Sequence, residues 1–339
     1  MKKQKLISII LTLATILVVV GWGQSATAAP AVQTAPEEGR VYKLGYSVIV
    51  EHPSLQKGFE GILAGLKKAG FEEGQNLEID LQNAQGEVAN TRSIAEKFVA
   101  DKVDLIIGHT TPSAQAAVQV AEGTDIPVVF FGISDPVGAG LVASVEEPSG
   151  SNVTGEWGPV PYRELFDLYA EVLPTMKKVG VLYNAGESNS VAAIEQVKAI
   201  AEEKGYEVVE ATVASSADVK TAAESLIGQV DAIVLPQDNT VVSALDAVVQ
   251  VAEQNQIPLF PMDPDSVKAG AIAAVASDPV TDGVITGILI ARMLLGEQPG
   301  DITPIIPSQY DVYVNSAAAE KMGVTVPQAV LDQAKEVYR

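Results

Sequence analysis

Residues 103–131 read VDLIIGHTTPSAQAAVQVAEGTDIPVVFF, and residues 230–262 return to the same pattern as VDAIVLPQDNTVVSALDAVVQVAEQNQIPLFPM. In both copies a Val-Asp pair opens an apolar run that is typical of a strand. A polar loop and a helix-like segment follow, and an Ile-Pro pair then opens a second apolar run. Internal duplication of βα units is evidence about architecture. The repeat therefore predicts two similar α/β halves with a cleft between them.

The repeat extends upstream and keeps its register. The run LGYSV at Leu44 corresponds to VGVLY at Val179, and Gly70 corresponds to Gly205 at the same spacing. Before each glycine, apolar residues recur on one helical face, at Leu55, Phe59, Ile62, Leu63 and Leu66 in the first copy and at Val191, Ile194, Val197, Ile200 and Ala201 in the second. Strands separated by helices form parallel sheets through right-handed crossovers. We therefore expect an α/β fold with two doubly wound parallel-sheet lobes joined by a hinge.

The lobe boundaries follow from where the pattern starts and ends. An N-terminal lobe is expected over residues 41–157 and a C-terminal lobe over residues 158–280. Residues 281–339 contain a helix-like run from Val284 and a short strand from Asp311. Their lobe membership stays open, because a chain can cross a hinge more than once.

Composition excludes several classes of partner. The 339 residues are 47% hydrophobic, which is enough for two cores, and the formal net charge is -21. An acidic surface repels phosphate backbones and anionic lipid headgroups, so binding to nucleic acid or directly to a membrane is disfavoured. The acidic residues are spread along the chain, which is typical of a solvated surface.

The N-terminus has the three parts of a secretory signal. A cationic start is followed by an apolar run from Leu6 to Val20 and by Ala26-Thr27-Ala28, which is placed for cleavage after Ala28. We expect a signal peptide over residues 1–28, a flexible leader over residues 29–40, and a periplasmic or secreted mature protein. An uncleaved N-terminal anchor is the alternative. The chain has no cysteine, which excludes disulfides and a lipid-modified N-terminal Cys.

Polar loops follow the predicted strands in both halves. Ligands of open parallel sheets bind outside the carboxyl ends of the strands, where such loops converge. The candidate ligand-binding residues are Glu51, His52, Thr110, Thr111, Ser113, Ser134 and Asp135 in the first half, Trp157 at its end, and Asn184, Glu187, Ser188, Asn189, Ser190, Asp238, Asn239, Thr240, Asp263, Asp265 and Ser266 in the second. Trp157 is either a packing residue at the hinge or an aromatic wall for the ligand.

Some of these loops suggest individual roles. Thr111–Ser113 and Ser188–Ser190 precede helices, where free N–H groups favour a ligand carboxylate; ordinary N-caps are the alternative. Asp238 follows an apolar strand and could hold a substrate ammonium, with a solvated loop aspartate as the competing interpretation. Asp135, Asp263 and Asp265 are further candidates for that role.

Signs of catalysis, metals or cofactors are weak. His52 and His109 lie on first-half loops and could form a metal site with Glu51 and Asp135, but two histidines without regular spacing favour polar lining or loop packing. The sequence has no Cys nucleophile, G-x-S-x-G, H-E-x-x-H or P-loop, and the G-x-G-x-x-A match at Gly138–Ala143 follows the wrong strand for a dinucleotide site. We expect neither an enzyme nor a cofactor.

Several runs together resemble a known family. IVEHPSLQ, DLQNAQGE, KFVADKVDLIIGHTTPSAQAA, IPVVFFGISDPVGAGLV, NVTG, VGVLYNAGESNSV, VDAIVLPQDNTVVSAL and DSVKAGAIA are similar to the tryptophan/tyrosine-type substrate-binding proteins of bacterial ABC transporters. The resemblance covers the chain from about Val41 to its C-terminus. It implies a type I periplasmic-binding-protein fold that closes on a small ligand, often an aromatic amino acid, and a permease and an ATPase as partners.

The chain departs from the family pattern in three places. Ala276–Val280 replaces a run containing two aromatics, Glu156-Trp157 replaces a Ser-Asp-like pair, and the lipobox Cys is missing. The first two changes concern the ligand, and the third favours a soluble periplasmic form.

The combined expectation is an extracytoplasmic solute-binding protein of an ABC importer. It would act as a monomer, capture a small ligand such as a hydrophobic or aromatic amino acid by lobe closure, and meet the membrane only through the permease. The alternative is the ligand-sensing ectodomain of a membrane-tethered signalling protein.

Overall fold

The computed structural model describes residues 33–306 and 309–339. The signal peptide expected at residues 1–28 lies outside the described residues, and the expected leader is described only from residue 33. That part is bonded to the N-terminal lobe, because the Gln33 N–H donates to the Leu295 carbonyl (2.7 Å) and the Arg40 guanidinium pairs with Asp104 (2.5 Å). No helix in the described ranges is both long and apolar enough to cross a bilayer.

The N-terminal lobe is built on a five-stranded parallel sheet in the order β2-β1-β3-β4-β5. Its elements are β1 (Tyr42–Val48), α1 (Pro53–Lys68), β2 (Leu77–Asn83), α2 (Val88–Ala100), β3 (Leu105–His109), α3 (Thr111–Ala121), β4 (Val128–Ile133) and β5 (Val153–Trp157). Every residue of β3 is buried, because α1 covers one face of the sheet while α2 and α3 cover the other. The continuous apolar run LII follows from this burial on both faces.

The C-terminal lobe holds two sheets around one core. A four-stranded parallel sheet has the order β7-β6-β8-β9, and a three-stranded sheet has the order β10-β11-β12. The elements are α4 (Tyr162–Val172), β6 (Lys178–Asn184), α5 (Ser188–Lys204), β7 (Glu207–Val213), η1 (Ser216–Asp218), α6 (Val219–Ser225), β8 (Ala232–Val234), α7 (Asn239–Val242), α8 (Leu245–Asn255), β9 (Leu259–Phe260), α9 (Pro264–Ala269), β10 (Ala273–Ala276), β11 (Asp311–Asn315), α11 (Ser316–Lys321), α12 (Gln328–Gln333) and β12 (Ala334–Tyr338).

The internal repeat is visible in the order of the strands. The orders β2-β1-β3-β4 and β7-β6-β8-β9 are the same arrangement, with the first strand of each half between the second and the third. All these pairs are parallel, so the predicted doubly wound α/β class is confirmed. The pattern ends at β10, which pairs with β11 in antiparallel fashion.

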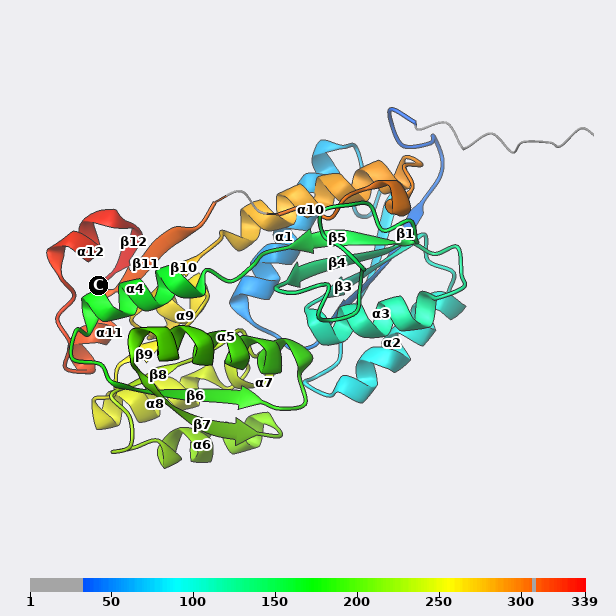
Figure 1. Cartoon of the computed structure of the whole chain (residues 1–339). Coiled ribbons are helices and arrows are strands. Elements are labelled where there is room, and N and C mark those ends of the chain that lie inside the picture. The colour runs from blue at the N-terminus through cyan, green and yellow to red at the C-terminus, as the bar shows by residue number, and fades with distance from the viewer. Residues whose placement is uncertain (1–32, 307–308) are drawn as a thin grey trace, which may run out of the picture. The chain divides into compact units, whose positions relative to one another are not determined.

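The chain passes between the lobes repeatedly. After β5 it enters the C-terminal lobe at α4, and after β10 it runs into α10 (Pro279–Leu294), which returns to α1 in the N-terminal lobe (Figure 1, orange beside blue). The short helix η2 (Pro299–Asp301) follows, and Ile305 pairs with Glu156 beside β5 before the chain reaches β11.

Helices α1 and α10 touch backbone to backbone. A Cβ atom added at Gly61 would lie 2.3 Å from the Val280 carbonyl oxygen, and one at Gly283 would lie 2.1 Å from the Gly58 carbonyl oxygen. One at Gly287 would lie 2.3 Å from the Ile62 carbonyl oxygen. Because the obstacle in each case is backbone, side chains cannot move aside to make room, and glycine is required for this approach.

We expect Gly287→Ala to destabilise the protein by about 2 kcal/mol, since overpacking against fixed backbone outweighs the gain in helix propensity. Ile288→Ala is the matched control, because Ile288 lies on the exposed side of the same helix. Urea denaturation of both variants measures the difference. Equal stability of Gly287→Ala and the wild type would contradict the described contact.

Candidate functional site

A cavity of about 180 Å³ lies at the carboxyl ends of strands from both lobes. Thr110 after β3, Ser134 after β4, Asp238 after β8 and Asp263 after β9 all line it. A water molecule needs about 10–15 Å³ of such space, so the cavity has room for on the order of a dozen non-hydrogen atoms. This is the size of one small molecule such as a single amino acid.

Only part of the expected ligand-binding set faces the cavity. The residues that line it are His52, Thr110, Thr111, Ser134, Asn189, Asp238, Asn239 and Asp263. The expected residues that do not line it are Glu51, Ser113, Asp135, Trp157, Asn184, Glu187, Ser188, Ser190, Thr240, Asp265 and Ser266. Glu51, Asp135 and Ser188 are exposed to solvent instead.

Several polar residues outside the cavity hold the loops in place. The buried Glu187 carboxylate accepts hydrogen bonds from the backbone N–H groups of Asn239 (3.2 Å) and Thr240 (3.0 Å), so it orders the start of α7. Asp135 accepts from the Gly138 N–H (2.8 Å) in its own turn. Trp157 is partly buried and packs against the core of the N-terminal lobe, and it does not line the cavity. These side chains support the site but do not face the cavity.

Asp238 lines the cavity, but its two carboxylate oxygens already have partners. One accepts from the Val241 N–H (2.7 Å) and caps α7, while the other accepts from the Asn184 N–H (2.6 Å). Burial, together with the charge of Glu187, raises the pKa of Asp238 above its ordinary value. The side chain expected to hold an ammonium is therefore committed to the backbone around it.

Sequence reasoning missed two acidic residues in the cavity wall, Glu156 of β5 and Asp282 of α10. Glu156 is 2% exposed, and one of its oxygens accepts from the Gly132 N–H (2.9 Å). Burial and the nearby charge of Asp282 raise the pKa of Glu156 to about 8. Burial also raises the pKa of Asp282 to about 6, while the Ser277 hydroxyl donates to its carboxylate (2.6 Å). For Glu156, the signal that the sequence offered was a glutamate inside a predicted strand.

His109 presents a neutral imidazole to the cavity. Its Nδ1 lies 2.5 Å from the hydroxyl of the buried Tyr46, and burial lowers the pKa of His109 to about 3. Among the described residues the Tyr46 hydroxyl has no other partner, so its proton goes to Nδ1 and Nε2 of His109 carries the imidazole proton. Nε2 lies beside Gly132, another cavity residue, since a Cβ atom added at Gly132 would be 3.2 Å from it. The site thus gains a neutral N–H donor.

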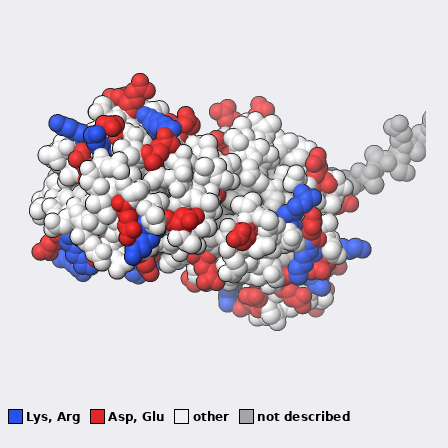
Figure 2. All heavy atoms as spheres, turned by 90° about the horizontal axis from the view of Figure 1, so that it is seen from below, with Lys and Arg blue, Asp and Glu red and all other residues white. Residues whose placement is uncertain are grey.

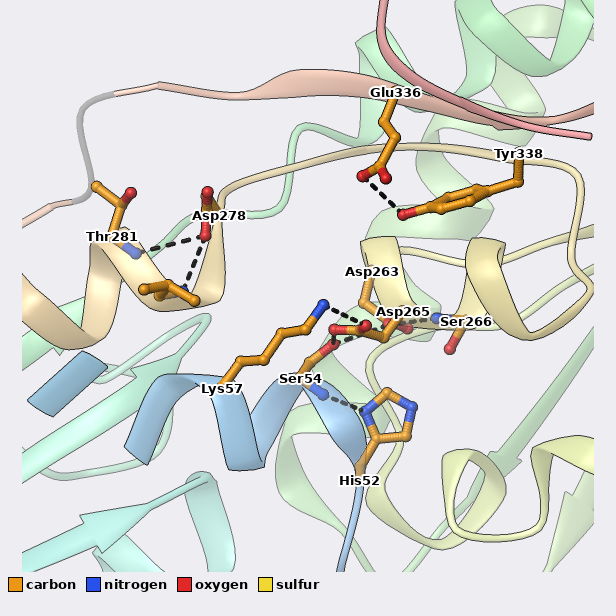
Figure 3. A network of polar contacts seen from close by, with 11 residues as sticks. His52, Ser54, Lys57, Asp263, Asp265, Ser266, Asp278, Thr281, Glu336 and Tyr338 are labelled. Atoms are coloured by element: carbon orange, nitrogen blue, oxygen red, sulfur yellow. Dashed lines mark hydrogen bonds and ion pairs between the residues drawn. The ribbon is translucent and has the colours of Figure 1, made fainter. Parts of the chain in front are cut away.

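Figure 3 shows polar contacts between the lobes, two of whose residues, Ser54 and Asp263, also line the cavity. The Ser54 hydroxyl of α1 donates to Asp263 (3.1 Å) and Asp265 (2.9 Å) at the start of α9, and the Lys57 ammonium pairs with Asp265 (2.6 Å). We call Ser54, Lys57, Asp263 and Asp265 the latch. Both aspartates were expected to contact ligand; Asp263 lines the cavity and also joins the lobes, whereas Asp265 joins the lobes without lining the cavity.

The charges seen on one face of the molecule are of both signs. On the face shown in Figure 2, acidic and basic side chains are interspersed over both lobes. In contrast, the cavity is lined by Glu156, Asp238, Asp263 and Asp282, and none of its described lining residues is Lys or Arg. Among the described residues, the charged side chains that line the cavity are therefore all acidic, unlike those on the face shown in Figure 2.

The chain is similar to several known proteins. The family model described as ABC transporter substrate binding protein matches residues 43–338. The chain is 39% identical over 272 residues to the tyrosine-binding protein of Clostridioides difficile (strain R20291), covering 80% of this chain and 78% of the relative.

Two solved structures are informative together. The ABC domain from Streptococcus pneumonia in complex with L-Trp is 33% identical, has a TM-score of 0.83 and covers 88% of this chain and 99% of its own. A ligand-free, open substrate binding protein with adhesive properties from Clostridium difficile is 35% identical with the same coverage, but its TM-score is 0.65. The structure of this chain is thus more similar to that of the L-Trp complex than to that of the ligand-free, open protein.

We expect Lys57→Ala to shift the free protein toward an open form, because it removes the charged partner of Asp265 from the latch. A partly exposed ion pair contributes up to about 1 kcal/mol, or about fivefold in the ratio of closed to open molecules. Small-angle scattering measures this as a larger radius of gyration. Lys321→Ala, which breaks an ion pair with Glu253 inside the C-terminal lobe, is the control. The latch assignment fails if the two variants scatter alike.

The raised pKa of Glu156 predicts a pH-dependent stability. The folded protein keeps this proton up to about pH 8, whereas the unfolded chain releases it near the ordinary value of 4.5. Stability is therefore lost as the pH rises between these values. We expect Glu156→Gln to remove this loss, so that its free energy of unfolding exceeds that of the wild type increasingly from about pH 5 to pH 8 and levels off above. A constant difference across this range, measured by urea denaturation, would refute the assignment.

Proposed function

Because the chain belongs to the family of ABC transporter substrate-binding proteins, we propose that it binds an amino acid with an aromatic or apolar side chain between its lobes. It acts outside the cytoplasm after export directed by residues 1–28 and delivers the ligand to a membrane permease driven by an ATPase. Binding and closure are its whole task, and no bond is made or broken. The tyrosine-binding relative and the L-Trp complex support this ligand class.

The observation that carries the proposal is the pair of acidic residues in the cavity. Glu156 and Asp282 each have one carboxylate oxygen with no hydrogen-bond partner among the described residues. A ligand ammonium is a donor with three N–H bonds and a positive charge, so it satisfies both oxygens by charge-assisted hydrogen bonds. The positive charge of the ammonium also offsets the cost of burying the two carboxylates, which raises both of their pKa values.

Neutral donors receive the ligand carboxylate. His109 offers Nε2–H, and the Thr110 hydroxyl is buried in the cavity wall with no partner among the described residues. The N-terminus of α3 at Thr111 adds free backbone N–H groups, as expected from the sequence.

The ligand side chain meets apolar walls from both lobes. Leu55 and Phe131 come from the N-terminal lobe, and Met262 and Val275 come from the C-terminal lobe. Closure therefore buries an apolar side chain on both sides, while the latch holds the lobes together next to it.

A thermal-shift screen of L-amino acids tests the proposal. We expect an aromatic amino acid to raise the melting temperature most, since a ligand at a hundredfold its Kd adds about 2.7 kcal/mol of stability. Glu156→Gln should abolish the shift, whereas Glu146→Gln, an exposed carboxylate outside the cavity, should retain it. If no amino acid shifts the wild type, the ligand class is wrong.

A further inference from the structure

The charges around the cavity are one-sided. Its lining includes the carboxylates of Glu156, Asp238, Asp263 and Asp282, and no Lys or Arg occurs among its described lining residues. A ligand ammonium entering this space is attracted by each of these four carboxylates that is ionised. A ligand carboxylate is repelled by the same groups and finds no cationic side chain to offset the repulsion.

The carboxylates differ in what they can offer a ligand. Asp238 has both oxygens bonded to backbone N–H groups. Asp263 is only partly buried; one of its oxygens accepts from Ser54 across the lobes and from the Ser266 N–H, and the other has no partner among the described residues. Glu156 and Asp282 keep one open oxygen each, and both sit where burial penalises an unpaired charge. The strongest unmet requirement of the cavity is therefore for a cation.

The side chains that face a ligand carboxylate are neutral. Thr110 is 6% exposed, and its hydroxyl has no partner among the described residues, which marks a place for a polar ligand atom. His109 is held neutral, with its Nδ1 occupied by Tyr46. A hydrogen bond from such a donor to the ligand carboxylate is charge-assisted only through the acceptor, whereas the ammonium and the cavity carboxylates can carry charge on both sides of their contacts. Removing the ligand carboxylate therefore loses the weaker of the two sets of contacts and relieves repulsion by the cavity carboxylates.

We propose that the ligand's ammonium decides binding and that its carboxylate is dispensable, so the cavity takes primary amines with an aromatic or apolar body. This inference rests on the proposed function and extends its ligand class to decarboxylated amines. The cavity would recognise the ligand through one ammonium group that contacts two carboxylates, Glu156 and Asp282, while the aromatic or apolar part of the ligand lies between the lobes.

The experiment compares three probes with one shared aromatic body by isothermal titration calorimetry. The sets are L-phenylalanine, phenylethylamine and phenylpropionate; L-tyrosine, tyramine and hydroxyphenylpropionate; and L-tryptophan, tryptamine and indolepropionate. We expect each amine to bind within about tenfold of its amino acid or more tightly, and each deaminated acid to bind at least about a hundredfold more weakly.

The outcomes separate this inference from the proposed function. If amino acids bind while their amines do not, or if the deaminated acids bind as well as the amino acids, the inference is overturned and the proposed function stands. If amines bind and amino acids do not, the inference holds and the amino-acid proposal fails. If none of the nine probes binds, both fail.

Two variants tie the result to the assigned carboxylates. Glu156→Gln and Asp282→Asn should each weaken binding of the amines by at least about tenfold, because each replaces a carboxyl group that can ionise beside the bound ammonium with a neutral amide. Glu146→Gln should leave it unchanged, and the melting temperature of each variant verifies folding. Unchanged amine affinity in both cavity variants, with the fold intact, would overturn the assignment.

Discussion

The close contact between α1 and α10 is the constraint on which the site depends. Glycines at 61, 283 and 287 let the two helix backbones touch, so a helix that follows a strand of the C-terminal lobe is fixed on the N-terminal lobe. The first turns of both helices then form one wall of the cavity. Leu55 and Gly58 come from α1, while Pro279 and Asp282 come from α10. The same turn of α1 carries Ser54 and Lys57 of the latch, so lobe closure and ligand contact share one rigid support.

The buried carboxylates show how the site opposes the stability of the fold. Glu156 and Asp282 lie close enough for the charge of one to raise the pKa of the other, and burial raises both. Such groups destabilise an empty protein at neutral pH, and a bound cation removes the penalty. Functional sites commonly retain such locally unfavourable arrangements. His109, kept neutral by burial and by Tyr46, adds a donor without adding a charge.

The sequence was sufficient to predict the architecture, because the repeat is written in local patterns. The Val-Asp strands, helix-ending glycines and Ile-Pro pairs led directly to two lobes, and the strand orders agree. The loops after β3, β4, β8 and β9 were likewise expected to converge, and the structure brings them to one cavity. What remained out of reach was which polar side chains face inward. Glu187 and Asp265 look like ligand contacts in sequence, yet one orders α7 and the other joins the lobes.

The residues that the sequence did not reveal as part of the site have their position in common. Glu156 and Tyr46 lie within strands and Asp282 lies within a helix, so a search confined to loops passes over them. Asp282 reaches the cavity only because α10 crosses back to the N-terminal lobe. The most direct test of the central claim is a crystal structure with the L-amino acid that gives the largest thermal shift. Our account predicts the ligand nitrogen within about 3 Å of carboxylate oxygens of both Glu156 and Asp282. A ligand nitrogen bound by Asp238 or Asp263 instead, or a ligand outside this cavity, would contradict it.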